Sequence, residues 1–331
     1  MLAIEMCTGG GGQAIGLEQA GFSCAAALEI DKHACATLRL NRPDWNVLEQ
    51  DMSLFEGQPY ANIDLFAAGV PCPPFSMAGK QLGKDDERDL FPEAIRIIGE
   101  SKPKAFMLEN VAGFASEKFR FYRQRIIDDL VDLGYSVDAK LLNASNFGVP
   151  QLRPRYIIVG LRDEFAPHFC WPLQTPCAET VGTTIRDLLA ANGWPGVERI
   201  VQQAKRIAPT IVGGSKKHGG PDLGPTRAKR QWAELGIDGK GIANEAPLLD
   251  APLDLMPRLT IRMVARLQGF PDDWDFVGGK TASYRQIGNA FPPPVARAVA
   301  TQIRRALLKE NAAYAVNRDK NGQLCFMEAK A

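Results

Sequence analysis

Short apolar runs alternate with segments of helical periodicity through the first half of the chain. Residues 1–6 and 22–30 have the pattern of strands, separated by a helical segment. The runs at 63–70 and 104–111 are almost wholly apolar, which is typical of strands buried on both faces. Strands and helices in this alternation predict an α/β fold with a doubly wound, mostly parallel sheet. Ligands of such a sheet bind at the carboxyl ends of its strands.

The pattern weakens in the middle of the chain and returns near its end. Residues 171–256 are rich in glycine and proline, although 226–235 have the pattern of a helix. Order returns at 259–269, and three prolines precede a helix over 295–309 with one apolar face. The tail, residues 311–331, carries no pattern that predicts an element or a role.

Composition narrows the class of protein. The 331 residues are 45% hydrophobic and 23% charged, which is typical of a soluble globular chain of about two domains. With 39 basic and 38 acidic side chains the net charge is +1, so affinity for nucleic acid must come from a local patch. No apolar run approaches the roughly 18 residues of a membrane span. The first basic residue, Lys32, comes late for a signal peptide, and we expect a cytoplasmic enzyme.

Cysteine and histidine give no sign of a disulfide framework or a metal site. The seven cysteines form an odd set without a C-x-x-C pair, and the three histidines lie far apart. Zinc sites and disulfide scaffolds both depend on such spacings. We therefore expect no metal, and most of the cysteines to be buried as small hydrophobic residues.

A glycine-rich turn follows the first strand. Four consecutive glycines, Gly9 to Gly12, allow a backbone to approach a ligand closely. Glu29 follows the second strand and suits a ribose diol, while Asp51 follows a third strand and suits an adenine amino group. A turn that is merely tight is an alternative interpretation, as is an Asp51 that caps a helix ahead of Ser53. The spacing also departs from G-x-G-x-x-G.

Reactive residues follow the two buried strands. Cys72 lies between two prolines directly after the run at 63–70, where a thiolate is a soft nucleophile toward an electron-poor carbon. Glu109 ends the next apolar strand and supplies an acid beside it, although a solvated carboxylate is the ordinary interpretation of Glu109 alone. Gln151, Arg153 and Arg155 alternate toward one side before a further strand, which suits a phosphate or a base edge.

In this order, the motifs resemble those of the cytosine-C5 DNA methyltransferase family of bacterial and phage type. The resemblance covers residue 1 to about 305. Its motifs are the glycine turn, Pro71-Cys72, Glu109-Asn110-Val111, residues 151–155, Arg266-Leu267-Gln268-Gly269-Phe270-Pro271 and Gln286-Ile287-Gly288-Asn289-Ala290. Six motifs in the family's order are not expected by chance.

The resemblance implies methyl transfer from S-adenosylmethionine to C5 of a cytosine flipped out of double-stranded DNA. Cys72 would attack C6, Glu109 would hold N3 and the exocyclic amine, and Arg155 would contact O2 with Arg153 beside it. Glu29 would bind the ribose and Asp51 the adenine. The cofactor-binding residues that we expect are Cys7, Thr8, Gly9, Gly11, Gly12, Glu29, Ile30, Asp51, Met52, Pro71, Leu90 and Asn289.

DNA contacts are expected mainly from a basic window over residues 199–230. The window holds eight basic residues against one acidic, a local balance of 8 − 1 = +7. A solvated charged face is the alternative interpretation. The DNA-binding residues that we expect are Ser76, Gln151, Lys216, Lys217, Arg227, Lys229 and Arg230.

The resemblance also implies a domain organisation. Residues 1–170 and 259–310 would form a Rossmann-like catalytic domain, with an antiparallel hairpin of strands 136–142 and 156–161 at the sheet edge. Residues 171–258 would form a smaller, irregular target-recognition domain.

Three positions depart from the family pattern. Cys7 replaces a common phenylalanine, Pro73 a glutamine and Met263 a glutamate. None of these removes a group that the chemistry requires, so we expect activity.

Three other functions remain open. A tRNA methyltransferase would use the same cysteine and glutamate, but its Cys-Phe-Thr signature is absent here. An inactive DNA-binding relative would not need Cys72 and Glu109. A Rossmann dehydrogenase or small-molecule methyltransferase would leave Cys72 and residues 151–155 without a task. The sequence leaves undetermined the DNA site, a bacterial or phage origin, a partner restriction endonuclease and the oligomeric state.

The basic window predicts a salt dependence of DNA binding. Replacing Lys216 and Lys217 together with alanine is expected to flatten the slope of log K against log salt by about one to two units, because fewer counterions are released. Fluorescence anisotropy over a salt series measures this slope. An unchanged slope would exclude both lysines as phosphate contacts.

Overall fold

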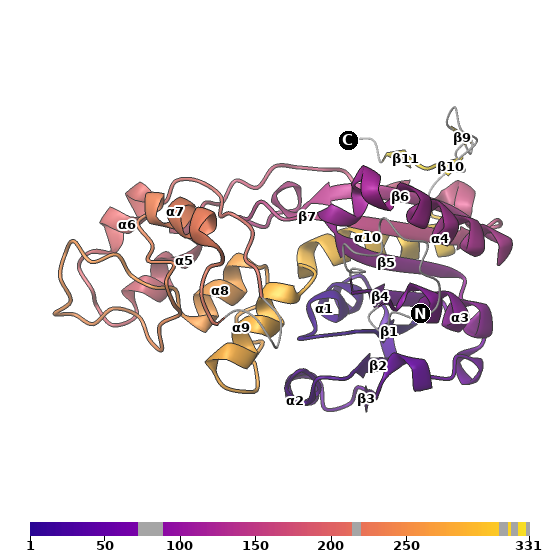
Figure 1. Cartoon of the computed structure of the whole chain (residues 1–331), viewed down its shortest axis with the longest axis horizontal. Helices are drawn as coiled ribbons and strands as arrows, with labels where there is room; N and C mark the ends of the chain where they lie inside the picture. The colour runs from indigo at the N-terminus through magenta and orange to yellow at the C-terminus, as the bar shows by residue number, and fades with distance from the viewer. Residues whose placement is uncertain (72–88, 214–219, 311–316, 319–323, 329–331) are drawn as a thin grey trace.

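A computed structural model of the chain describes residues 1–71, 89–213, 220–310, 317–318 and 324–328. A seven-stranded sheet of order β3-β2-β1-β4-β5-β7-β6 lies at its centre, and a smaller helical part lies to one side (Figure 1). Its strands are β1 (Leu2–Met6), β2 (Ser23–Glu29), β3 (Val47–Glu49), β4 (Leu65–Gly69), β5 (Ala105–Val111), β6 (Tyr135–Asn143) and β7 (Pro154–Arg162). Two-residue strands follow: β8 (Cys170–Trp171), β9 (Asn317–Arg318), β10 (Leu324–Cys325) and β11 (Met327–Glu328).

Ten α-helices lie within the described residues. They are α1 (Gly12–Gln19), α2 (Lys32–Asn41), α3 (Phe91–Ser101), α4 (Arg120–Asp132), α5 (Val181–Ala190), α6 (Val197–Gln203), α7 (Thr226–Glu234), α8 (Ile261–Leu267), α9 (Lys280–Asn289) and α10 (Pro293–Leu307). Short 3₁₀ helices connect them: η1 (Met52–Leu54), η2 (Gln58–Tyr60), η4 (Ala112–Ala115), η5 (Glu117–Phe119), η6 (Ala144–Asn146) and η7 (Ala166–His168).

The sheet confirms the predicted fold class. Strands β3, β2, β1, β4 and β5 are parallel, whereas β7 is antiparallel to both β5 and β6. The expected hairpin therefore closes one edge of a doubly wound sheet. β3 ends at Glu49, two residues before the predicted end, and Asp51 instead caps η1.

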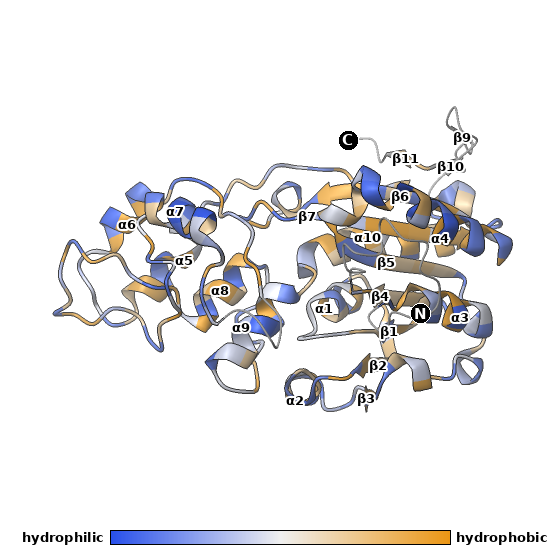
Figure 2. Ribbon diagram, viewed as in Figure 1, coloured by the Kyte–Doolittle hydropathy of each residue, from blue (hydrophilic) through white to orange (hydrophobic). Residues whose placement is uncertain are grey.

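Side chains of the sheet alternate between two cores. Ala3, Ala67 and Met107 pack on one face with α1 and α10. Ile4, Phe66 and Phe106 point to the opposite face and pack with α3 and α4. Figure 2 shows these strands as mainly hydrophobic, while the outer helices carry hydrophilic residues. Burial on both faces explains why the central strands have unbroken apolar runs.

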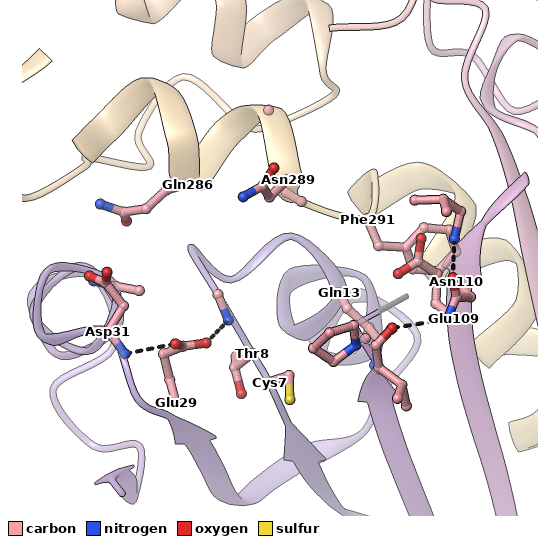
Figure 3. Close-up of a pocket in the computed structure, with 18 of the residues that line it drawn as sticks. Cys7, Thr8, Gln13, Glu29, Asp31, Glu109, Asn110, Gln286, Asn289 and Phe291 are labelled. Atoms are coloured by element: carbon pink, nitrogen blue, oxygen red, sulfur yellow. Dashed lines mark hydrogen bonds between the residues drawn. The ribbon is translucent and has the colours of Figure 1, made fainter. Parts of the chain in front are cut away.

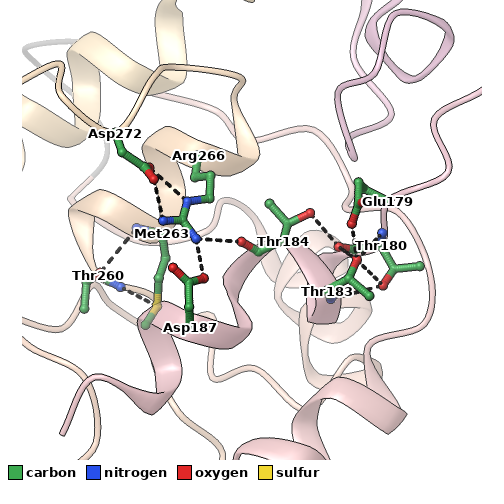
Figure 4. Close-up of polar contacts among 9 residues, drawn as sticks. All are labelled: Glu179, Thr180, Thr183, Thr184, Asp187, Thr260, Met263, Arg266 and Asp272. Carbon is green, nitrogen blue, oxygen red and sulfur yellow. Dashed lines mark hydrogen bonds and ion pairs between the residues drawn. The ribbon is translucent and has the colours of Figure 1, made fainter.

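A third core joins the smaller helical part to the sheet domain. It contains Ile185 of α5, Trp232 of α7 and Val264 of α8, and it reaches Ile15 and Leu38 beside the sheet. Arg266 fixes the junction between α5 and α8: it donates to the Thr184 carbonyl and pairs with Asp187 and Asp272 (Figure 4). Arg266, the first residue of the motif at 266–271, therefore has a structural role.

Met263 has a structural explanation. Thr260 caps α8, accepting from the Met263 amide at 3.3 Å, and the Met263 sulfur lies 3.4 Å from the Thr260 nitrogen (Figure 4). The sulfur thus occupies the place of the acceptor that a glutamate supplies in a capping box. The departure at Met263 leaves the start of the helix intact.

The end of the chain docks on the sheet domain, which the sequence did not indicate. β11 pairs with β8, and Phe326 packs at 4.9 Å between ring centroids on Phe169. The buried Asp138 carboxylate accepts from the Phe326 amide at 2.8 Å and from the Trp171 indole at 2.9 Å. Residues 324–328 thus complete a buried polar contact.

Alanine substitutions at two helix glycines are expected to change the stability in opposite directions, because α1 packs closely on α10 whereas α3 has room for a Cβ at its glycine. A Cβ on Gly16 would lie 2.5 Å from the Ala296 Cβ and 2.7 Å from the Pro293 carbonyl oxygen. Gly16→Ala is therefore expected to lower the free energy of unfolding by about 1–3 kcal/mol. A Cβ on Gly99 in α3 would meet Leu133 at an ordinary 3.5 Å, so Gly99→Ala should raise it by about 0.5–1 kcal/mol. Urea unfolding compares the two, and equal shifts would contradict the packing.

Candidate functional site

A pocket of about 940 Å³ opens at the carboxyl ends of β1, β2, β4 and β5. Figure 3 shows Glu29 and Asp31 at one side and Glu109 and Asn110 at the other. The expected site residues that line it are Cys7, Thr8, Gly9, Glu29, Ile30, Asp51, Met52, Pro71, Leu90, Glu109, Arg153, Arg155 and Asn289. The fold thus brings together residues from both ends of the chain, at the edge where a parallel sheet binds its ligands.

The glycine turn contributes one glycine to the pocket and uses the others for packing. Gly9 lines the pocket, and a Cβ there would meet nothing within 4 Å. A Cβ on Gly11 would lie 2.5 Å from the Trp274 ring, and one on Gly12 would lie 2.3 Å from the Phe291 carbonyl oxygen. The expectation that Gly11 and Gly12 contact a ligand is corrected: they admit the returning chain.

Cys7 lines the pocket in a left-handed conformation, with φ of 55°. Burial, followed by the charges of Glu29 and Glu5, raises the pKa of its thiol far above the ordinary value. Cys7 is therefore a neutral thiol at physiological pH, and its side chain is part of an apolar wall. The phenylalanine of the family is replaced here by a much smaller group.

Glu29 is held by the backbone in an orientation that leaves one oxygen available. Its Oε1 accepts from the amides of Ile30 and Asp31 at 2.9 and 2.8 Å. Its Oε2 accepts from the Gly9 amide at 2.7 Å and retains a second lone pair. A carboxylate fixed in this way suits a hydroxyl donor, as expected for a ribose.

Asp51 caps η1, which is one of the two interpretations that the sequence left open. Its Oδ1 accepts from the Ser53 amide and hydroxyl at 2.8 and 2.7 Å, which caps η1. These hydrogen bonds lower the pKa of Asp51, the one from the Ser53 hydroxyl most strongly. The same residue lines the pocket. An ionised carboxylate therefore lies at the pocket wall, where it can accept from an amino group.

A buried ion pair marks the other end of the pocket. Glu109 Oε1 lies 2.7 Å from Arg155 Nε, and both side chains are about 10% exposed. Burial raises the pKa of Glu109, and the positive charges of Arg155 and Arg153 oppose this rise. The pair supplies a carboxyl acceptor or donor and a guanidinium edge within a nearly dry site.

Asn110 connects this ion pair to the strand that precedes Cys72. Its Nδ2 donates to the Val70 carbonyl at 3.1 Å, and its Oδ1 accepts from the Val111 amide at 2.8 Å. Pro71 lines the pocket immediately afterwards. Asn110 therefore fixes the end of β4 relative to β5, although the sequence indicated no separate role for it.

Four expected residues fall outside the described part of the chain: Cys72, Ser76, Lys216 and Lys217. Of the other basic residues, Arg227 and Arg230 are exposed on α7. Lys229 is half-buried and pairs with Asp222 at 2.7 Å. Of the three basic residues on α7 that we expect to contact DNA, Lys229 would have to give up its ion pair with Asp222 to do so.

Gln151 and the two Nη atoms of Arg153 are bonded within the protein, whereas the buried Arg153 Nε has no partner among the described residues. Gln151 is fully buried, and its Nε2 donates to the Leu267 carbonyl at 3.1 Å and Gln268 Oε1 at 2.7 Å. Arg153 is 1% exposed and donates to three backbone carbonyls. The expectation of a DNA contact by Gln151 is therefore wrong, because its amide is used within the protein. Arg155 alone of the three remains beside the pocket's acid.

Glu5 and Gln13 are among the pocket residues that the sequence did not indicate. Glu5 on β1 is buried and its Oε1 lacks a hydrogen-bond partner among the described residues. Neither amide atom of the buried Gln13 on α1 has one there either. The available signal was an acid inside an otherwise apolar strand. Buried polar atoms left unpaired at a pocket wall point to a polar ligand.

The described residues include neither a metal-binding cluster nor a membrane-spanning helix. No group of three or more His, Cys, Asp and Glu side chains there could hold a metal ion. No helix in that part of the chain is long and apolar enough to span a bilayer.

The buried Glu5 predicts a pH-dependent stability difference. Burial, and then the charge of Glu29, raises the pKa of Glu5 well above 4.5. Its stabilising contribution is complete below about 4.5 and is lost as pH rises through the folded-state pKa. Relative to the wild type, Glu5→Gln should gain stability from pH 5 to 8, by up to about 1.4 kcal/mol per pH unit. Urea unfolding without ligand measures this gain.

The control is Glu117→Gln, because the Glu117 side chain is 81% exposed. Its unfolding curve should keep a constant offset from the wild type over the same pH range. A constant offset for Glu5→Gln as well would contradict the assignment of a raised pKa.

Comparisons with known proteins agree with the motifs. A sequence model described as C-5 cytosine-specific DNA methylase matches residues 1–305. Type II methyltransferase M.NaeI of Lentzea aerocolonigenes is 55% identical over 311 residues, covering 93% of this chain and 75% of that protein. Type II methyltransferase M.NgoMIV of Neisseria gonorrhoeae is 53% identical over 315 residues, covering 93% and 99%.

A solved structure is similar as well. It is described as a DNA modification methyltransferase encoded within a prophage of E. coli, and superposes with a TM-score of 0.65 at 25% identity. The match covers 93% of this chain and 99% of that one. Because both kinds of comparison span nearly the whole chain, the protein is a DNA cytosine methyltransferase and belongs to the C-5 cytosine-specific DNA methylase family.

Proposed function

We propose that the protein transfers a methyl group from S-adenosylmethionine to C5 of one cytosine within a specific duplex sequence. The observation that carries this proposal is the buried Glu109–Arg155 ion pair, which lies beside Pro71 in a pocket that continues to Glu29. A base that reaches a pair this buried has left the duplex stack, at a cost of a few kcal/mol.

The cofactor fits the other half of the pocket. Glu29 would accept from the ribose hydroxyls and Asp51 from the adenine amine, while Ile30, Met52 and Leu90 supply apolar contacts. The unpaired atoms of Glu5 and Gln13 suit the charged amino-acid end. When bound, S-adenosylmethionine supplies an electrophilic methyl group.

The protein's own groups would activate the cytosine. The Cys72 thiolate adds to C6 while Glu109 donates to N3, so that the electrons displaced toward the ring make C5 nucleophilic. A raised pKa suits Glu109 to this task because it retains a proton more readily than an exposed glutamate. After methylation a base removes the C5 proton. The 5,6 double bond then forms again as Cys72 leaves as thiolate and the N3 proton returns to Glu109. Arg155 would orient the base through O2.

Arrangement of the chain supports a division of labour. We propose that residues 1–170 with 259–310 form the catalytic domain and that 171–258 read the DNA, with Arg227 and Arg230 as phosphate or base contacts. Similarity to the two type II methyltransferases named above supports a modification of DNA. We propose that the protein acts in the cytoplasm. The recognised sequence follows from expressing the protein in a host that lacks cytosine methylation and sequencing its methylated cytosines.

The covalent mechanism predicts a trapped adduct. With S-adenosylmethionine present and 5-fluorocytosine in place of cytosine in duplex DNA, the methylated adduct carries a C5 fluorine that cannot be removed as a proton is, so the Cys72–C6 bond should persist on a denaturing gel. Cys72→Ser should form no adduct. Glu109→Gln should form it at least about 10²-fold more slowly, because the proton donor at N3 is lost.

An RNA of the same sequence serves as the matched substrate control. An adduct with RNA alone would contradict a DNA substrate and favour the tRNA branch. DNA binding without an adduct would instead identify an inactive DNA-binding relative.

A further inference from the structure

The buried guanidinium of Arg153 joins two distant parts of the chain to β7. Its Nη1 donates to the Ile211 carbonyl at 2.6 Å. Its Nη2 donates to the carbonyls of Gly288 at 2.6 Å and Ala290 at 2.9 Å. Gly288 lies in the last turn of α9 and Ala290 follows its end, where a cation also complements the helix dipole. All three bonds are charge-assisted and shielded from water, so they fix the geometry firmly.

Gln151 holds the same peptide segment from its other side. Its Oε1 accepts from the Ile211 amide at 2.9 Å, while Arg153 binds the Ile211 carbonyl. The Leu152 amide also donates to the Ala208 carbonyl at 2.8 Å, and the Thr210 hydroxyl donates to the Leu152 carbonyl. Residues 208–211 are therefore bound along their length to residues 151–153, which directly precede β7 and its Arg155.

The segment then crosses the last turn of α9 at a distance that only glycine permits. A Cβ on Gly213 would lie 2.6 Å from the Arg285 carbonyl oxygen and 2.5 Å from Asn289 Oδ1. A Cβ on Gly288 would lie 2.4 Å from the Gly213 nitrogen. Two backbones in direct contact leave no free space between them, so a displacement of one must displace the other.

The two partners of this contact serve different ends of the reaction. The turn of α9 carries Asn289 and Ala290, which line the pocket, and Arg285 lies 3.4 Å from Asp31 beside Glu29. Residues 210–213 belong to the part of the chain that continues to α7, with its exposed Arg227 and Arg230. The proposed cofactor site and the proposed DNA-reading domain thus meet at Gly213 and Gly288.

We propose that Arg153 is a positioning residue that couples DNA binding to cofactor binding through the Gly213–Gly288 contact, an inference that rests on the proposed function. DNA bound by the recognition domain changes the position of the last turn of α9 and thereby the affinity for the cofactor. The bound cofactor in turn changes the affinity of the recognition domain for DNA. Thermodynamic linkage requires that DNA changes the Kd of the cofactor by the same factor as the cofactor changes the Kd of DNA. For coupled sites this factor is about 5–150-fold.

The test measures that factor in the full-length protein. Isothermal titration gives the Kd of S-adenosylhomocysteine alone and with a saturating duplex that carries the recognised sequence. The wild type should show a ratio of the two Kd values of about 5 or more. Gly213→Ala should bring the ratio toward 1, because the added Cβ separates the two backbones.

Gly279→Ala is the matched control. Gly279 precedes α9, and a Cβ there would meet nothing within 4 Å. This variant should keep the ratio of the wild type. Arg153→Lys keeps the charge but cannot hold three carbonyls in the same geometry, and should lower the ratio as well. A thermal unfolding curve checks that each variant is folded.

The outcomes separate this proposal from the proposed function. A wild-type protein that binds S-adenosylhomocysteine with a ratio of 1 overturns the coupling alone. A Gly213→Ala variant that binds both ligands more weakly but keeps the ratio of the wild type also overturns it, because the contact is then only structural. A wild type that does not bind S-adenosylhomocysteine overturns the proposed function and the coupling with it.

Discussion

The pairing of Glu109 with Arg155 depends on a strand that runs against the rest of the sheet. Glu109 lies two residues before the end of β5, at the carboxyl edge of the sheet, where a parallel neighbour could offer only its own carboxyl end. β7 is antiparallel, and its first residues lie beside the last residues of β5, with Arg155 opposite Val111. The hairpin therefore places a cation from the start of one strand against an acid at the end of another. Without that cation, the cost of burying Glu109 as an anion would be several kcal/mol.

The pocket forms because residues 274–296 pack on the glycine turn and α1 near the start of the chain. Trp274 donates from its indole to the Gly10 carbonyl at 2.9 Å, and the Phe291 carbonyl approaches Gly12. Ala296 then packs on Gly16. These glycines are spaced along the turn and α1, so each successive contact brings a later residue of the chain close. Glycine in this segment mainly admits other parts of the protein, and only Gly9 is left to face the pocket.

Local pattern predicted the fold and the positions of the charged strand ends well. Apolar runs fixed the strands because burial on both faces leaves few polar positions, and Glu29 and Asp51 followed from where those strands stop. Alternation predicted that the side chains of Gln151 and Arg153 point to the same side, and both bind Ile211. It did not predict which groups they would bind. These partners lie 58 to 137 residues away in sequence, and no local periodicity contains them. The docking of Phe326 was missed for the same reason, since it depends on a buried carboxylate at Asp138.

The charge count of the basic window overstates the number of cations that are available to contact DNA. Arg206 pairs with Glu234 at 3.2 Å and Lys229 with Asp222 at 2.7 Å, while Arg199 donates to the carbonyls of Leu253 and Leu255. Glu234 lies outside the window, so it neutralises a charge that the count of +7 includes. Within the described residues, Arg227 and Arg230 form no ion pair and have no competing partner to lose. A cation that must leave a carboxylate gains little by reaching a phosphate. We therefore expect these two arginines to contribute more to the proposed DNA binding than their share of the count.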